Sequence, residues 1–178
     1  MNRTSASRVA TRHLSTIEGG TAFLAYPAPL RSAAPLVHFH GKILRAFQII
    51  YSTFVKEVVG SSITVHLHPR KSMGNLIGHV KSDDLARGVV HVYFVDGSVP
   101  YSLANIGHEL AHVLQYQRGD LSFKDGAILW KGKPYLTYDD YTALGRAAHN
   151  ALPWERDAIA EGKAKASMFE KKIPSLQG

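Results

Sequence analysis

Five consecutive residues in this chain carry side chains that can hold a metal ion and move a proton. They are His108, Glu109, Leu110, Ala111 and His112, in the pattern H-E-x-x-H. On an α-helix, residues four positions apart lie one turn above each other, so both imidazoles project to the same side. Two neutral imidazole nitrogens at that spacing can bind one Zn²⁺. Glu109 lies about 100° further round the helix than His108, which places it near the metal rather than on it.

This arrangement predicts hydrolytic zinc chemistry. From its position beside the metal, Glu109 can take a proton from a zinc-activated water and return it to a leaving amine. Random shuffling of a chain of this composition gives about 0.02 such pentads, so composition alone explains the motif poorly. Gly107, just before the first histidine, would also let a neighbouring backbone approach closely. Two alternatives stay open: a surface helix whose histidines bind nothing, and a zinc site that has lost catalysis.

A catalytic zinc site needs a third protein ligand and an open position for water. The chain has no cysteine, so nitrogen and oxygen must supply the ligands. The downstream candidates are His149, Glu155, Asp157 and Glu161. A three-histidine site built on H-E-x-x-H-x-x-G-x-x-H is disfavoured, because residues 115–118 contain neither glycine nor histidine. His149 is therefore the weaker candidate.

The motif together with a later segment resembles a known group of zinc peptidases. The later segment is Leu152-Pro153-Trp154-Glu155-Arg156-Asp157-Ala158. With the pentad, it resembles the gluzincins, and around Pro-Trp-Glu-Arg it is especially similar to short metallopeptidase-like proteins of phages and bacteria. The resemblance covers residues 89–163. It implies that Glu155 is the third zinc ligand and that Ala158 lets a second helix pack near the first.

The chain departs from the gluzincin pattern at one position. Many gluzincins carry an aspartate after that alanine, as a hydrogen-bonding partner for a zinc histidine. This chain has Ile159 there. The hydrogen-bonding partner of the zinc histidine is therefore unassigned, and the candidates are Asp157, Glu161 and Asp140.

Peptide hydrolysis also needs a donor for the developing oxyanion. Tyr138, Tyr141 and His149 lie between the motif and the predicted third ligand. We predict Tyr141 and His149 as the donors. The alternative for the tyrosines is packing against the core.

Other histidines occur in two close pairs, His38 with His40 and His66 with His68. Each pair places two imidazoles on one face of an extended chain. A cupin-like or accessory metal site would use such pairs, but no carboxylate accompanies them at a clear spacing, which disfavours this interpretation.

The elements that must position these residues follow from the periodicity of apolar side chains. We predict a first helix over 37–59, followed by an antiparallel meander of strands over 63–67, 76–80 and 89–95 with a turn over 83–88. The motif helix is predicted over 98–118. After it we predict a short strand or hairpin over 130–136 around Gly132, a short helix over 139–148 and a last helix over 153–172. Strand 76–80 or strand 89–95 would align an extended peptide by strand addition.

This order of elements predicts an α+β fold. We expect a minimal zincin-like domain, with a small antiparallel or mixed sheet packed on the H-E-x-x-H helix and a second long helix. The 178 residues suffice for one domain. We predict a flexible amino-terminal arm over 1–35 and a single zincin-like metallopeptidase domain over 36–178. The arm's scattered arginines also fit an organelle-targeting segment, which is the less favoured interpretation.

Composition and charge narrow the classes of protein to which this chain can belong. No apolar run approaches the length of a membrane span and no secretory signal is evident, so we expect a soluble protein without membrane insertion. The net charge is +7, but the basic residues are scattered, which favours a solvated surface over a nucleic-acid interface. The sequence thus predicts a zinc-dependent metallopeptidase acting on a peptide or protein. The alternatives are a non-catalytic zinc-stabilised module, such as a virion component, and a basic nucleic-acid-associated protein.

Overall fold

The structure, a computed structural model, describes residues 35–60, 63–74, 76–81 and 87–176. Its elements are β1 (Leu36–Phe39), α1 (Arg45–Val58), β2 (Thr64–Arg70), β3 (Gly78–Lys81), β4 (Val89–Val95), α2 (Val99–Arg118), β5 (Leu121–Lys124), β6 (Ala127–Trp130), β7 (Lys133–Thr137), α3 (Tyr138–Thr142), α4 (Arg146–Asn150), α5 (Pro153–Glu170) and α6 (Ile173–Leu176). Helices beside two small sheets make this an α+β fold, as predicted. The predicted arm over 1–35 lies outside the described residues, except for its last residue.

The larger sheet has the strand order β1-β2-β4-β3. β1 pairs with β2 and β2 with β4 in parallel, and β3 is antiparallel to β4. The predicted antiparallel meander is therefore wrong, and the sheet is mixed. Alternating apolar residues indicate which face a strand buries, and they carry no information on the direction of its neighbour. The predicted turn over 83–88 lies mostly outside the described residues.

Two of the predicted helices have different bounds. The helix predicted over 37–59 begins only at Arg45, because Val37 and Phe39 face the core in alternation with histidines and form β1. The short helix predicted over 139–148 is two helices, α3 and α4, which are separated at residues 143–145. The motif helix and the last helix were predicted to within two residues at each end.

The smaller sheet is the antiparallel set β5-β6-β7. The predicted hairpin around Gly132 is confirmed as β6 and β7, and β5 was not predicted. Lys131 and Gly132 both have positive φ (51° and 76°), the combination that a tight two-residue hairpin turn requires. This sheet and α3 pack around Trp154, which is fully buried at the start of α5. The smaller sheet therefore fixes the end of α5 that carries Glu155.

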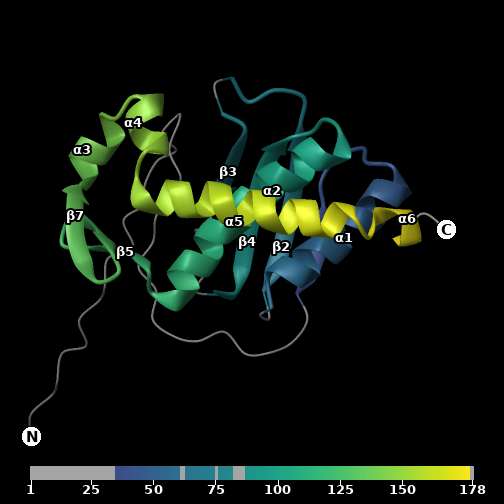
Figure 1. The fold of residues 1–178 in the computed structure, drawn as a ribbon, viewed down its shortest axis with the longest axis horizontal. Coiled ribbons are helices and arrows are strands. Elements are labelled where there is room, and N and C mark those ends of the chain that lie inside the picture. The colour runs from purple at the N-terminus through teal and green to yellow at the C-terminus, as the bar shows by residue number, and fades with distance from the viewer. Residues whose placement is uncertain (1–34, 61–62, 75, 82–86, 177–178) are drawn as a thin grey trace, which may run out of the picture.

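The long helices pack on one face of the larger sheet. Buried side chains from α1, α2 and α5, including Phe54, Ile106 and Phe169, share one core with the inward residues of β2, β3 and β4. In Figure 1, α5 (yellow) crosses in front of α2, and the sheet lies behind α2. α2 is thus enclosed between the sheet and α5, which explains how Glu109 and His112 come to be buried.

Two glycines allow the backbones of α2 and α5 to touch. A Cβ atom on Gly162 would lie 2.6 Å from the backbone nitrogen of His108, and one on Gly107 would lie 3.0 Å from the carbonyl oxygen of Gly162. The close approach predicted at Gly107 is confirmed. Ala158, one turn earlier on α5, is fully buried, but the tightest contact is at Gly162.

Replacing Gly162 by alanine should strain this crossing, because the atoms it would meet are backbone and cannot turn away. We expect Gly162→Ala to lower the free energy of unfolding by about 1–3 kcal/mol in chemical denaturation. Gly60→Ala is the matched control, since a Cβ there meets nothing within 4 Å. Equal stability of the two variants would contradict the described packing.

Candidate metal centre

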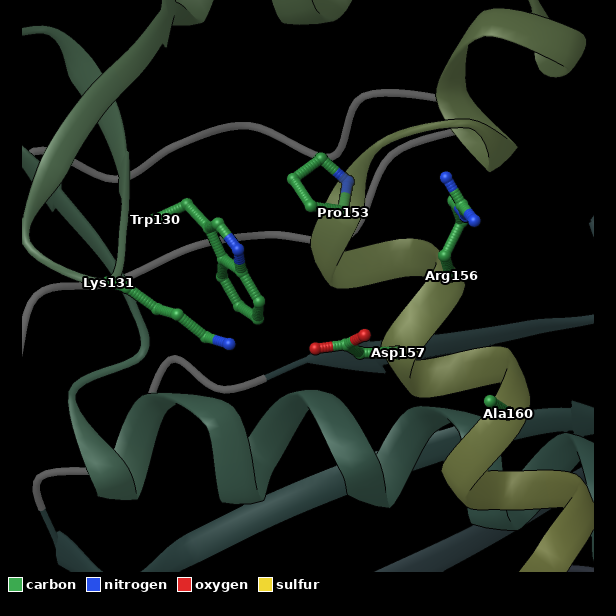
Figure 2. Close-up of a pocket in the computed structure, with 6 residues that line it drawn as sticks. All are labelled: Trp130, Lys131, Pro153, Arg156, Asp157 and Ala160. Carbon is green, nitrogen blue, oxygen red and sulfur yellow. The ribbon is translucent and has the colours of Figure 1, made fainter.

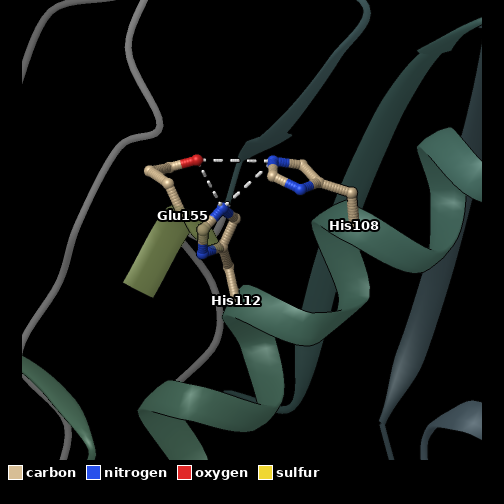
Figure 3. Close-up of side chains that lie close together, drawn as sticks. All are labelled: His108, His112 and Glu155. Carbon is tan, nitrogen blue, oxygen red and sulfur yellow. Dashed lines mark hydrogen bonds and ion pairs between the residues drawn. The ribbon is translucent and has the colours of Figure 1, made fainter. Parts of the chain in front are cut away.

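Three side chains of the described residues converge between α2 and α5. His108, His112 and Glu155 each offer one ligand atom, and these atoms lie within 4.8 Å of one another. The two histidine Nε2 atoms are 3.3 Å apart, and Glu155 Oε2 lies 3.5 Å from each of them. Figure 3 shows the three atoms facing one another. The sequence-predicted ligands are thus brought together.

The spacing of these atoms fits a tetrahedral metal ion. With zinc–ligand bonds of about 2.0–2.2 Å, two ligands of a tetrahedron lie about 3.3–3.6 Å apart. All three separations fall in that range. Two imidazole nitrogens and one carboxylate oxygen are also the donor set that catalytic zinc sites use. The residues therefore suit a zinc ion, with a fourth position left for water or substrate.

Gln115 orients the imidazole of His112. The amide nitrogen of Gln115 donates to the backbone carbonyl of Trp154 at 2.9 Å, so its oxygen faces His112. That oxygen lies 3.0 Å from Nδ1 of His112 and can only accept, so Nδ1 carries a hydrogen. Nε2 is then the atom directed at the other two ligands. Sequence reasoning missed Gln115, although it lies on the buried side of the same helix, one turn after His112.

None of the three candidate carboxylates is the partner of His112 Nδ1, which is Gln115. Asp140 accepts from the hydroxyl of Thr137 at the start of α3. Glu161 pairs with Arg118 and Lys165. Asp157 lines a surface pocket of about 360 Å³.

That pocket lies where the β6–β7 turn meets α5. It is lined by Trp130, Lys131, Pro153, Arg156, Asp157 and Ala160. Figure 2 shows Lys131 and Asp157 pointing toward one another across it. None of the three candidate metal ligands lines the pocket, so the pocket is separate from the candidate metal site.

Tyr141 and His149 reach the site from α3 and α4. His149 Nε2 lies 3.5 Å from Glu155 Oε1 and 2.9 Å from the hydroxyl oxygen of Tyr141. Tyr141 is buried and the side chain of His149 is 21% exposed, so His149 lies between the buried carboxylate and solvent. Tyr138, the third candidate donor, instead packs edge-on against Phe123. The two preferred donors are therefore beside the site and the third is not.

Glu109 is buried under the edge of the larger sheet. A Cβ on Gly78 of β3 would lie 2.5 Å from Glu109 Oε1, so only a glycine fits there without moving the carboxylate. Burial raises the pKa of Glu109 to about 8, although the charge of His112 acts to lower it. Its Oε2 atom has no hydrogen-bond partner among the described residues. A buried carboxyl oxygen left unpaired in this way suits a group that exchanges protons with a bound water.

The three ligand side chains share one proton. Burial lowers the pKa of His112, but the adjacent Glu155 carboxylate more than offsets this and raises it to about 9. Burial lowers the pKa of His108 to about 4, and the charge on His112 adds to that effect. Burial acts to raise the pKa of Glu155, but the neighbouring histidines, chiefly His112, lower it overall. Near pH 7 the metal-free site is thus an imidazolium–carboxylate pair beside a neutral His108.

Comparison with known proteins adds no relative: no family model matches the chain, and neither a curated protein nor a solved structure does. Among the described residues, no helix has the length and apolar character needed to cross a membrane. The assignment of the site therefore rests on its geometry and on the residues that build it.

Zinc binding at pH 7 should release between one and two protons, since the ion replaces the proton on His112 and lowers the pKa of Glu109, which is about 8 in the metal-free protein. The apparent affinity should therefore rise at least tenfold per pH unit up to about pH 8 and level off above about 9, the raised pKa of His112. Calorimetry in buffers of different ionisation enthalpy measures the protons released. Zinc binding with no proton release at pH 7 would contradict the shared-proton description.

Loss of the Gln115 amide should loosen the orientation of His112. We expect Gln115→Ala to weaken zinc binding by about 10–100-fold, the usual cost of removing such a supporting group. Gln117→Ala, two residues later on the same helix, is the control. Competition with a chromogenic chelator measures both affinities, and equal values would exclude a role for Gln115.

Proposed function

We propose that this chain is a zinc-dependent metallopeptidase. The observation that carries the proposal is the position of Glu109, a buried carboxyl with an unpaired oxygen next to a group of three metal-ligand atoms. In a zinc site that only stabilises the fold, protein ligands fill every coordination position, and no unpaired carboxyl is needed beside the ion. We therefore propose that Glu109 transfers protons in the reaction.

His108, His112 and Glu155 would hold the ion. When bound, zinc would act as a Lewis acid on the attacking water and on the scissile carbonyl. Glu109 accepts a proton from that water on its carboxylate and delivers it to the nitrogen of the leaving amine. Its pKa of about 8 in the metal-free protein would fall beside a dication, toward the range in which a carboxyl can both take and return a proton.

Tyr141 and His149 are the proposed donors to the oxyanion of the tetrahedral intermediate. Both lie on the Glu155 side of the site, and they are linked to each other at 2.9 Å. The partial exposure of His149 suits a group that must meet a substrate. Donors held in place before the substrate arrives stabilise developing charge without a cost of reorganisation.

β3 is the proposed binding strand for an extended peptide. Of the two strands considered, β4 pairs on both sides, whereas β3 is the last strand of its sheet among the described residues. Gly78 on β3 lies against Glu109, so a peptide added to this edge would run past the proposed base. This geometry favours β3 over β4 as the substrate-binding strand.

The test compares Glu109→Gln with a matched Glu161→Gln variant, whose carboxylate pairs with surface cations. Both variants should hold about one zinc per chain by elemental analysis. We expect casein digestion to fall by about 10²–10⁴-fold in Glu109→Gln alone, the usual contribution of a general acid–base group. Equal activity of the two variants would reject the role of Glu109. Zinc-loaded wild type that digests no peptide or protein would favour a non-catalytic, zinc-stabilised module.

A further inference from the structure

The face of the larger sheet away from the helices is rich in histidine. Along β2 and β4, inward residues such as Val65 and Val92 enter the core, and the residues between them face outward. The outward set includes six histidines, His38, His40, His66, His68, His79 and His91. Strands β1, β2, β3 and β4 thus each direct at least one imidazole away from the core that the sheet shares with α2 and α5. Figure 1 shows these helices on one side of the sheet.

Four of these side chains form a compact block, which we call the histidine quartet: His40, His66, His68 and His91. Two nitrogen pairs link neighbouring strands, His40 Nε2 with His66 Nδ1 at 3.0 Å and His68 Nε2 with His91 Nδ1 at 2.9 Å. The rings also stack, with centroids 4.5 Å apart for His40 and His68 and 4.6 Å apart for His66 and His91. Each ring therefore contacts rings of the quartet in two directions.

The strand register creates this block. His38, His66 and His91 occupy one row across β1, β2 and β4. The next row outward along the strands contains His68 and Tyr93, whose rings stack at 4.3 Å. A slip of one residue in any pairing would turn the imidazoles into the core. The strand register therefore fixes the face of the sheet on which the quartet lies.

The chemistry of this surface favours transition metals. β1 to β4 contain no aspartate or glutamate, so the strands offer nitrogen ligands without carboxylates, which disfavours Ca²⁺ and Mg²⁺. Burial and the neighbouring histidines lower the pKa of His68 to about 4 and lower that of His66. Neutral imidazole is the form that binds metal, so both lowered pKa values favour a metal ion over a proton at His66 and His68.

We propose that the histidine quartet is a second metal site, which binds late divalent transition metals, Cu²⁺ most tightly, through its two nitrogen pairs. Each pair supplies two protein ligands, and among the described residues only His108, His112 and Glu155 form a group of three. Structural and catalytic zinc sites use at least three protein ligands, whereas Cu²⁺ is the strongest binder of a given nitrogen site. The site is independent of the proposed peptidase activity, because it lies on the opposite face of the sheet.

The test measures copper uptake by the full chain whose His108–His112–Glu155 site has first been loaded with zinc. Copper(II) chloride is the probe, with elemental analysis after desalting and electron paramagnetic resonance for nitrogen ligation. We expect the wild type to take up copper beyond its zinc, with nitrogen hyperfine structure. His40→Gln with His68→Gln removes one ligand from each pair and should raise the copper Kd at least tenfold. His38→Gln is the control, an exposed histidine on the same face that lies outside both pairs.

Circular dichroism establishes that each variant is folded. The single variant His40→Gln should remove one of the two copper-binding pairs and leave the other. His108→Ala with His112→Ala separates this site from the proposed catalytic one, since that variant should lose peptidase activity and keep the copper uptake. Equal copper binding by the wild type and the double quartet variant would overturn the proposal. So would the absence of copper uptake by the zinc-loaded wild type.

Discussion

The candidate site depends on the backbone contact between α2 and α5. Because Gly107 and Gly162 lack side chains, the two helices approach until the backbones of Gly162 and His108 touch. That approach places Glu155, two turns earlier on α5, against the histidines of α2. Gln115 then joins His112 to the carbonyl of Trp154, so the residue before the third ligand is tied to the second ligand's helix. The ligand geometry is therefore a consequence of how the helices pack.

The sequence predicted the parts of the molecule that depend on local periodicity. Helical spacing placed His108 and His112 on one side of α2, and the predicted range of 98–118 agrees with its ends to within one residue. The resemblance to gluzincins singled out Glu155, which lies with them. What local patterns could not predict was the direction of β4 relative to β2, since both directions bury the same alternating residues. Gln115 was missed because amide side chains are common on helices, and its role appears only once Trp154 lies beside it.

The molecule holds its histidines in two contrasting environments. Between α2 and α5, the Glu155 carboxylate keeps a proton on His112, while burial and the charge on His112 lower the pKa of His108 to about 4. On the outer face of the sheet no carboxylate is available from the strands, and burial together with the neighbouring histidines lowers the pKa of His66 and His68. A metal ion entering the first environment would displace a proton and would have three ligand atoms available. One entering the second would have the two nitrogen atoms of a pair available. The two environments should therefore differ in metal preference.

The central claim is that one zinc ion lies between His108, His112 and Glu155, and anomalous X-ray diffraction tests it directly. Crystals of the zinc-loaded protein, measured on both sides of the zinc absorption edge, would locate each bound ion without reference to activity. We expect a strong zinc peak at about 2.0–2.2 Å from His108 Nε2, His112 Nε2 and Glu155 Oε2. An anomalous map with no peak between these atoms, or with zinc only on the outer face of the sheet, would contradict it.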